Sequence, residues 1–304
     1  MRARLGINTC FAVKRWPDPD DWARIVREEL DLDLVELSLD LMEVTGSPDE
    51  RQRTADLVRA ALARHGLHAE ATFTGLAAYS QNLLMHPDPD ARRRALAWYF
   101  DVVDLTARLG ARAAGGHVGA MSVADWSDPR RRARRWSELK RGLAEIAARA
   151  RAAGLEYLLV ENLASPREPS TIAGLADLLT DGDDAHVPVR LCLDVGHQCV
   201  PGTAGDDRDP YAWLRRFGNR LPEVQLQQTD GLADHHWPFT AERNETGLIE
   251  PGRLLDTLAD AGAEDVMLML EVIPPFEADD RQVLAELRSS VTLWADALRE
   301  RGLR

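Results

Sequence analysis

The sequence predicts an α/β fold, a single (β/α)8 barrel domain that spans residues 1–304. Short apolar runs rich in Val, Ile and Leu alternate with longer amphipathic stretches, which is typical of a parallel sheet covered by helices. This alternation repeats through eight cycles. The chain is also long enough for a barrel, which usually needs roughly 250 residues. Together, the rhythm, the number of cycles and the length favour the barrel.

Each cycle contributes one expected strand and one expected helix. The strands are expected at 5–10, 34–39, 68–73, 111–117, 157–162, 190–195, 223–228 and 266–272. The helices are expected to begin near Pro19, Ser47, Pro89, Asp128, Ser170, Asp209, Glu250 and Asp279, where the residue type suits the free N–H groups of a first turn. Four glycines, Gly66, Gly110, Gly154 and Gly262, stand just before an expected strand and predict helix ends there.

A doubly wound open sheet would show the same alternation of strands and helices. Its dinucleotide-binding form usually carries a G-x-G-x-x-G loop after the first strand, and here that junction reads "GINTCFAVKRW". The phosphate-binding pattern G-x-x-x-x-G-K-[ST] does not occur in the sequence either. The barrel is therefore the favoured fold.

The composition argues against nucleic acid and membrane partners. The formal net charge is -13, whereas phosphate polymers are bound by Lys and Arg. Three scattered cysteines predict neither a disulfide framework nor a structural zinc site. No apolar run is long enough for a signal peptide or a transmembrane helix, so we expect a cytoplasmic protein.

Three acidic residues stand at the carboxyl ends of different expected strands. Glu161 lies in "LLVENL", Asp194 in "LCLDVGH" and Glu271 in "MLMLEV", and a glutamine of "VQLQQTDG" comes at a similar height. Each acid alone could cap a helix or pair with Arg, but in a barrel these strand ends meet at one mouth. Three such carboxylates would repel one another, and a divalent cation removes the repulsion. The sequence therefore predicts a metal site, with Mn²⁺ favoured and Mg²⁺ as an alternative.

Histidines accompany the three acids. His197 follows the second acid by three residues, and His236 and Trp237 lie in "DHHWPFT" after the seventh expected strand. Asn8 and His117, at the ends of the first and fourth expected strands, are candidates for the same mouth. Because loops above a barrel often carry function, we expect these five residues to contact the substrate or the metal.

The segments "VEN" at Glu161, "CLDVGH" at Asp194 and His197, and "LEV" at Glu271 resemble the xylose isomerase-like barrels of sugar-phosphate isomerases and ketose 3-epimerases. The resemblance spans nearly the whole chain. It implies that the two glutamates and the aspartate bind Mn²⁺, Mg²⁺ or Co²⁺, and that Glu161 and Glu271 move the proton beside a ketone. The stretch "LQQTDG" with "DHHWPFT" is similar to the erythritol-pathway branch, which acts on tetrulose phosphates such as erythrulose phosphate.

One position departs from the pattern of this family. Its members usually place a metal-binding His where this chain has Gln225, or at a neighbouring glutamine if the register is shifted by two residues. A glutamine oxygen is a weaker ligand. We therefore expect Gln225 as the fourth ligand, with His236 as its possible substitute. If the substrate carries a phosphate, Arg167 or Arg243 could neutralise it.

Two other functions stay open at this point. AP endonucleases share the barrel and use comparable Glu, Asp and His motifs, including the D-x-H of Asp234 and His236, which would make the chain a phosphodiesterase. The acidic composition and the missing His after the third expected strand argue against it. The departure at Gln225 also fits a partner-dependent barrel, such as a subunit of a deglycosylating complex. The expected partner is a small sugar or sugar phosphate, and the chain could form a homodimer.

Overall fold

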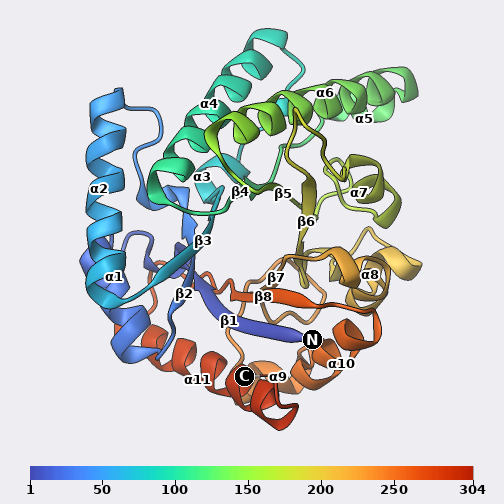
Figure 1. Ribbon diagram of the computed structural model, residues 1–304. Coiled ribbons are helices and arrows are strands. Elements are labelled where there is room, and N and C mark those ends of the chain that lie inside the picture. The colour runs from blue at the N-terminus through green and yellow to red at the C-terminus, as the bar shows by residue number, and fades with distance from the viewer. Residues whose placement is uncertain (304) are drawn as a thin grey trace.

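The computed structural model describes residues 1–303 and confirms the predicted barrel (Figure 1). Eight parallel strands pair in chain order, and the last strand pairs with the first, so the sheet is closed. Figure 1 shows the strands around the centre and the helices outside them. The strands are β1 (Arg2–Asn8), β2 (Leu34–Ser38), β3 (His68–Phe73), β4 (Ala113–Gly116), β5 (Tyr157–Glu161), β6 (Val189–Asp194), β7 (Glu223–Leu226) and β8 (Asp265–Leu270).

Each expected helix begins within two residues of its predicted start. At Asp88, Asp128 and Asp209, the side-chain carboxylate accepts a backbone N–H of the first turn, which satisfies a donor that the helix leaves free. Three short helices, α3 (Leu76–Tyr79), α5 (Val123–Ser127) and α9 (Ala241–Thr246), were not expected. The helices are α1 (Pro19–Arg24), α2 (Pro48–His65), α3 (Leu76–Tyr79), α4 (Pro89–Leu109), α5 (Val123–Ser127), α6 (Pro129–Ala153), α7 (Ile172–Leu178), α8 (Pro210–Phe217), α9 (Ala241–Thr246), α10 (Pro251–Asp260) and α11 (Asp280–Glu300).

The predicted glycine stops are confirmed. Gly66, Gly110 and Gly154 are the C-cap residues of α2, α4 and α6, with φ values of 65°, 78° and 86°. Gly262 follows α10 with φ at 81°. In this left-handed region a β-carbon would be strained, so glycine lets the chain leave the helix and enter the next strand.

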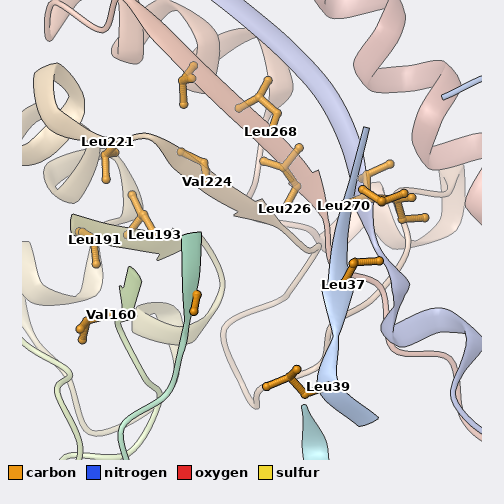
Figure 2. Close-up of a cluster of buried hydrophobic side chains, with 14 of the residues drawn as sticks. Leu37, Leu39, Val160, Leu191, Leu193, Leu221, Val224, Leu226, Leu268 and Leu270 are labelled. Atoms are coloured by element: carbon orange, nitrogen blue, oxygen red, sulfur yellow. The ribbon is translucent and has the colours of Figure 1, made fainter. Parts of the chain in front are cut away.

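Alternate residues of the strands form two separate layers. Figure 2 shows side chains of the outer layer, which include Leu191 and Leu193 on β6 and Leu268 and Leu270 on β8. They belong to the main apolar core, which also contains helical residues such as Trp294. Successive side chains of a strand point to opposite faces, so the intervening residues face the barrel interior.

The interior layer contains polar groups as well as apolar ones. Glu36 on β2 and Gln225 on β7 are fully buried, and the Gln225 amide donates to Glu36 Oε2 at 3.0 Å. These strands are not neighbours in the sheet, so the contact crosses the barrel. Asn8 Nδ2 also donates to Glu36 Oε2, at 2.6 Å, and to Glu271 Oε1, at 3.2 Å. A polar network therefore extends from the interior to the end of β8.

Two strands, β4 and β7, are shorter than the sequence suggests by two residues or more. β4 begins at Ala113 rather than at residue 111. β7 ends at Leu226 rather than at residue 228, because Gln228 leaves the sheet and pairs with Trp237 through two backbone hydrogen bonds of 2.9 and 3.1 Å. This bridge closes the loop at 229–236 and fixes its two ends above the barrel.

Candidate active site

The three predicted acids converge at the carboxyl ends of the strands. Glu161 ends β5, Asp194 ends β6, and Glu271 directly follows β8. One carboxylate oxygen from each lies within 4.8 Å of the other two, and all three residues are buried. Among the described residues, Glu271 Oε2 has no hydrogen-bond partner. Buried carboxylates so close together require protons or a cation, so this donor set fits a divalent metal ion.

Neighbouring groups fix the orientation of Asp194. Its Oδ1 accepts the backbone N–H groups of Gly196 and His197 at 2.7 and 2.9 Å. The side chain of Asn162 bonds to both the N–H and the carbonyl of Asp194, each at 2.9 Å. Gln227 Nε2 lies 3.1 Å from Oδ1 and 3.2 Å from Oδ2. Groups of this kind, which hold a metal ligand in place, raise metal affinity.

The two glutamates differ in their pKa values. Burial alone would raise the pKa of Glu161, but the nearby His197 and His117 outweigh burial and lower it. The pKa of Glu271 is raised well above its usual value by burial and by the charges of Glu161 and Asp194, although His236 opposes the shift. Carboxyl groups with opposite shifts in one site are typical of acid/base pairs.

Of the two candidate glutamines, Gln227 is the one beside the carboxylates. Gln225 pairs with Asp194 in the sheet register, but its amide contacts Glu36 in the barrel interior. Gln227 contacts both Asp194 and Asp234. The two glutamines are two residues apart, so they point to the same face of the strand at different heights. The geometry thus favours the position shifted by two residues over Gln225.

The loop after β7 places Asp234 and His236 beside His197. Asp234 Oδ2 lies 3.3 Å from His197 Nε2, and Asp234 Oδ1 lies 3.2 Å from His236 Nε2. Although burial lowers the pKa of His236, the charge of Asp234 outweighs burial and raises this pKa to about 10. Asp194, His197 and His236 together form a further group that could hold a metal ion.

A cavity of about 240 Å³ opens beside these groups. Six of the predicted site residues line it, namely Asn8, His117, Glu161, His197, His236 and Glu271. His117 Nδ1 contacts Thr74 at 2.9 Å, and within the described structure its Nε2 has no partner. Of the described residues that line the cavity, none is Lys or Arg.

Three residues predicted as contacts have other positions. Trp237 does not line the cavity; its ring stacks on His235, with centroids 3.8 Å apart, and the Arg243 guanidinium lies over the same ring, 4.2 Å from its centroid. Arg167 donates to the carbonyl of Met121 at 2.9 Å. Neither of these arginines lines the cavity, so the geometry does not support their predicted role with phosphate.

The sequence reasoning missed several cavity residues. Thr74 and Tyr79 follow β3, and the Tyr79 ring packs edge-on against His117 with centroids 5.1 Å apart. Asp40 fixes the short helix α3 that carries Tyr79, because its carboxylate accepts the N–H groups of Leu76 and Ala77 at 2.6 and 3.2 Å. No local motif announces these contacts, since they join loops that follow β2, β3 and β4.

Comparisons with known proteins agree with the fold. The family model of the xylose isomerase-like TIM barrel matches residues 26–290. D-erythrulose 1-phosphate 3-epimerase of Brucella abortus is 33% identical over 97% of this chain and 96% of its own length. A solved structure from Rhodospirillum rubrum, provisionally described as a xylose isomerase, is 34% identical with a TM-score of 0.89 and covers 97% of this chain and 99% of its own.

A more distant structure shares the fold. D-psicose 3-epimerase of Clostridium cellulolyticum, solved with D-tagatose, has a TM-score of 0.73 at 17% identity and covers 97% of this chain and 99% of its own. None of the helices within residues 1–303 is long and apolar enough to cross a membrane. The match over most of the chain, together with the full-length relatives, shows that the chain belongs to the xylose isomerase-like TIM barrel family of enzymes.

Proposed function

We propose that this chain is a divalent-metal-dependent 3-epimerase of a small ketose phosphate, of the erythrulose 1-phosphate kind. The observation that carries the proposal is the convergence of Glu161, Asp194 and Glu271 beside a cavity of about 240 Å³. The full-length relative named as D-erythrulose 1-phosphate 3-epimerase supports the choice of substrate. The net charge of -13 and a cavity lining without Lys or Arg, as far as the structure is described, disfavour a DNA phosphodiesterase.

The metal site would use the three carboxylates, with Gln227 or His236 as the additional ligand. Gln227 contacts Asp194, and His236 Nδ1 lies 3.6 Å from Glu271 Oε2, so both reach the edge of this set. A bound Mn²⁺, Mg²⁺ or Co²⁺ would supply Lewis-acid stabilisation of the charge that develops on the substrate oxygen. The sequence favours Mn²⁺ because hard oxygen ligands dominate the set.

The protein side chains would move the proton. Glu161 and Glu271 come from β5 and β8, which are separated in the closed sheet by β6 and β7, so they can approach a substrate from different sides. One carboxylate removes the proton from C3, and the electron pair of the C–H bond passes into the neighbouring carbonyl. The other carboxyl group returns a proton to the opposite face of C3, and the carbonyl reforms. His117 and Asn8, which line the cavity, would hold substrate hydroxyls.

Isotope exchange tests this proposal. Erythrulose 1-phosphate incubated in D2O with metal-loaded enzyme should gain deuterium at C3, as followed by NMR. Glu161→Gln and Glu271→Gln should each abolish the exchange, because the amide of a glutamine side chain cannot take up the proton. Glu223→Gln is the matched control, because it removes a fully buried carboxylate that does not line the cavity. Retention of the original hydrogen at C3 in the unaltered enzyme would contradict the epimerase reaction, and near-normal exchange in both test variants would exclude this mechanism.

A further inference from the structure

Glu271 is held by fewer contacts than the other two carboxylates of the site. Asp194 Oδ1 accepts two backbone N–H groups, and Glu161 Oε1 lies 3.2 Å from His197 Nδ1. Among the described residues, a single hydrogen bond reaches the Glu271 carboxylate, from Asn8 Nδ2 to Oε1 at 3.2 Å. Oε2 has no hydrogen-bond partner there. The position of this carboxylate therefore depends on the side chain of Asn8.

The amide of Asn8 has one favourable orientation. Its Oδ1 accepts the backbone N–H of Cys10 at 2.8 Å, and a backbone N–H group can only donate. Nδ2 therefore turns its two hydrogens toward the carboxylates of Glu36, at 2.6 Å, and Glu271, at 3.2 Å. The flipped amide would bring an oxygen against two carboxylates. In the observed orientation, Oδ1 keeps one lone pair for a substrate hydroxyl.

Glu36 makes the shorter of the two carboxylate contacts of Asn8, and shorter charge-assisted hydrogen bonds are the stronger ones. The two residues are partners in the register of β1 and β2, so their side chains meet inside the barrel. Gln225 Nε2 donates to the same oxygen of Glu36 at 3.0 Å. Glu36 is fully buried and does not line the cavity, so any influence on the substrate must pass through other side chains.

We propose that Glu36 is a positioning residue, which fixes the amide of Asn8 and through it the carboxylate of Glu271. This inference rests on the proposed function, in which Glu271 holds the metal and moves a proton. An apolar residue in place of Glu36 would leave one hydrogen of the Asn8 amide without an acceptor, so the amide would shift. A displacement of about 1 Å in a reacting group can lower a rate by roughly 100-fold.

Metal affinity tests the positioning without relying on turnover. Each protein is stripped with a chelator and titrated with Mn²⁺ by calorimetry. Glu36→Leu should bind Mn²⁺ roughly 10- to 100-fold more weakly than the unaltered protein, because a metal ligand has lost its fixed orientation. Glu36→Gln should keep most of the affinity, since its amide oxygen can still accept the hydrogen of Asn8.

Glu223→Leu is the matched control. Glu223 is also a fully buried carboxylate of the barrel interior, and within the described structure its side chain has no hydrogen bond to Asn8. The control therefore removes the same chemical group without touching the contact in question, and it should bind Mn²⁺ as the unaltered protein does. The unfolding temperature of each metal-free variant checks that the barrel is intact.

A double-mutant cycle separates positioning from a general loss of structure. If Glu36 acts through Asn8, then Glu36→Leu should add little to Asn8→Ala. The Mn²⁺ affinity of the double variant should therefore lie within about twofold of that of Asn8→Ala alone. If Glu36 had only a structural role, the losses of the two single variants would add.

Hydrogen exchange at C3 gives a second readout with the metal-saturated enzymes. Glu36→Leu should lower kcat roughly 10- to 100-fold and change KM by less than about threefold, because Glu36 lies outside the cavity. Equal metal affinities in Glu36→Leu and Glu223→Leu, additive losses in the cycle, or a Glu36→Gln as weak as Glu36→Leu would overturn the inference and leave the proposed function intact. No C3 exchange in the unaltered enzyme would overturn the function instead, and the metal affinities would still decide whether Glu36 positions Glu271.

Discussion

Replacing Glu223 by Gln should make the stability of the protein less dependent on pH. Glu223 and Glu36 are both fully buried inside the barrel, and each has one carboxylate oxygen without a hydrogen-bond partner in the described structure. Burial and then the charge of Glu36 raise the pKa of Glu223 well above its usual value. A proton between the two carboxylates would give both of these oxygens a partner. The folded protein therefore keeps a proton that the unfolded chain loses.

The sign and size of the effect follow from this difference in bound protons. A glutamate in the unfolded chain titrates near pH 4.3, so above that pH only the folded state still holds the proton. The free energy of unfolding then falls as the pH rises toward the folded pKa, by about 1.4 kcal/mol per pH unit for one proton. Glutamine keeps an N–H donor for Glu36 at every pH. Between pH 5.5 and 7.5 the variant should gain stability relative to the parent protein, by at most about 2.7 kcal/mol, which is the value for one proton held over the whole range.

Urea unfolding of the metal-free proteins, followed by tryptophan fluorescence, measures this gain. The difference in unfolding free energy between Glu223→Gln and the parent is determined at several pH values between 5.5 and 7.5. The contributions of groups that titrate equally in the variant and the parent cancel in this difference of unfolding free energies. The exposed Glu242, replaced by Gln in the same way, is the control and should give a constant difference. Parallel stability curves for Glu223→Gln and the parent would refute the shared proton.

Three further predictions concern the site. In Gly196→Ala, a β-carbon 2.4 Å from Gln227 Cδ would displace this side chain, so metal affinity measured by calorimetry should fall roughly 10- to 100-fold. Asp40→Ala removes the acceptor that caps α3, so Tyr79 should lose its fixed position, and KM should rise several-fold more than kcat falls. Removing metal with a chelator should lower the unfolding temperature, and a free ion at 100 times its Kd should restore about 2.7 kcal/mol of stability.

Each of these predictions has a clear contrary result. Gly142→Ala, whose β-carbon would have its nearest neighbour at 3.7 Å, is the control for Gly196→Ala, and equal metal affinities in the two variants would contradict the displacement of Gln227. Unchanged kinetics in Asp40→Ala would mean that α3 does not position the cavity. An unfolding temperature insensitive to both chelator and added metal would count against any metal in the carboxylate site.

Most of the fold could be predicted from the sequence because its signals are local. The alternation of apolar residues located the strands, and residues such as Asp88 and Gly110 marked where a helix begins and ends. The end of β7 could not be predicted in this way. Gln228 continues the pattern of the strand, but its backbone pairs with Trp237 nine positions later, and only the folded loop creates that partner.

The candidate site was partly predictable for the same reason. Glu161, Asp194 and Glu271 could be predicted because they stand at the ends of expected strands, and these ends meet at one mouth in any barrel. Gln225 is the register partner of Asp194, yet its side chain contacts Glu36, and Gln227, beyond the end of β7, is the one that reaches the Asp194 carboxylate, which the sequence alone does not show. Tyr79 depends on a short helix held by a distant loop, so it carries no signal of its own. The cytoplasmic location and the homodimer stay predictions.

The bridge between Gln228 and Trp237 fixes the base of the loop at 229–236, so the tip of the loop can change without moving its base. Its two backbone hydrogen bonds hold the base of the loop whatever side chains lie between them. Residues near the tip, such as the exposed Leu232, can therefore be replaced without moving the pinned ends. Evolution could adjust which molecules enter here by changing the tip, while Asp234 and His236 keep their places in the site, and loop grafting among related barrels should be easiest when these two residues are retained.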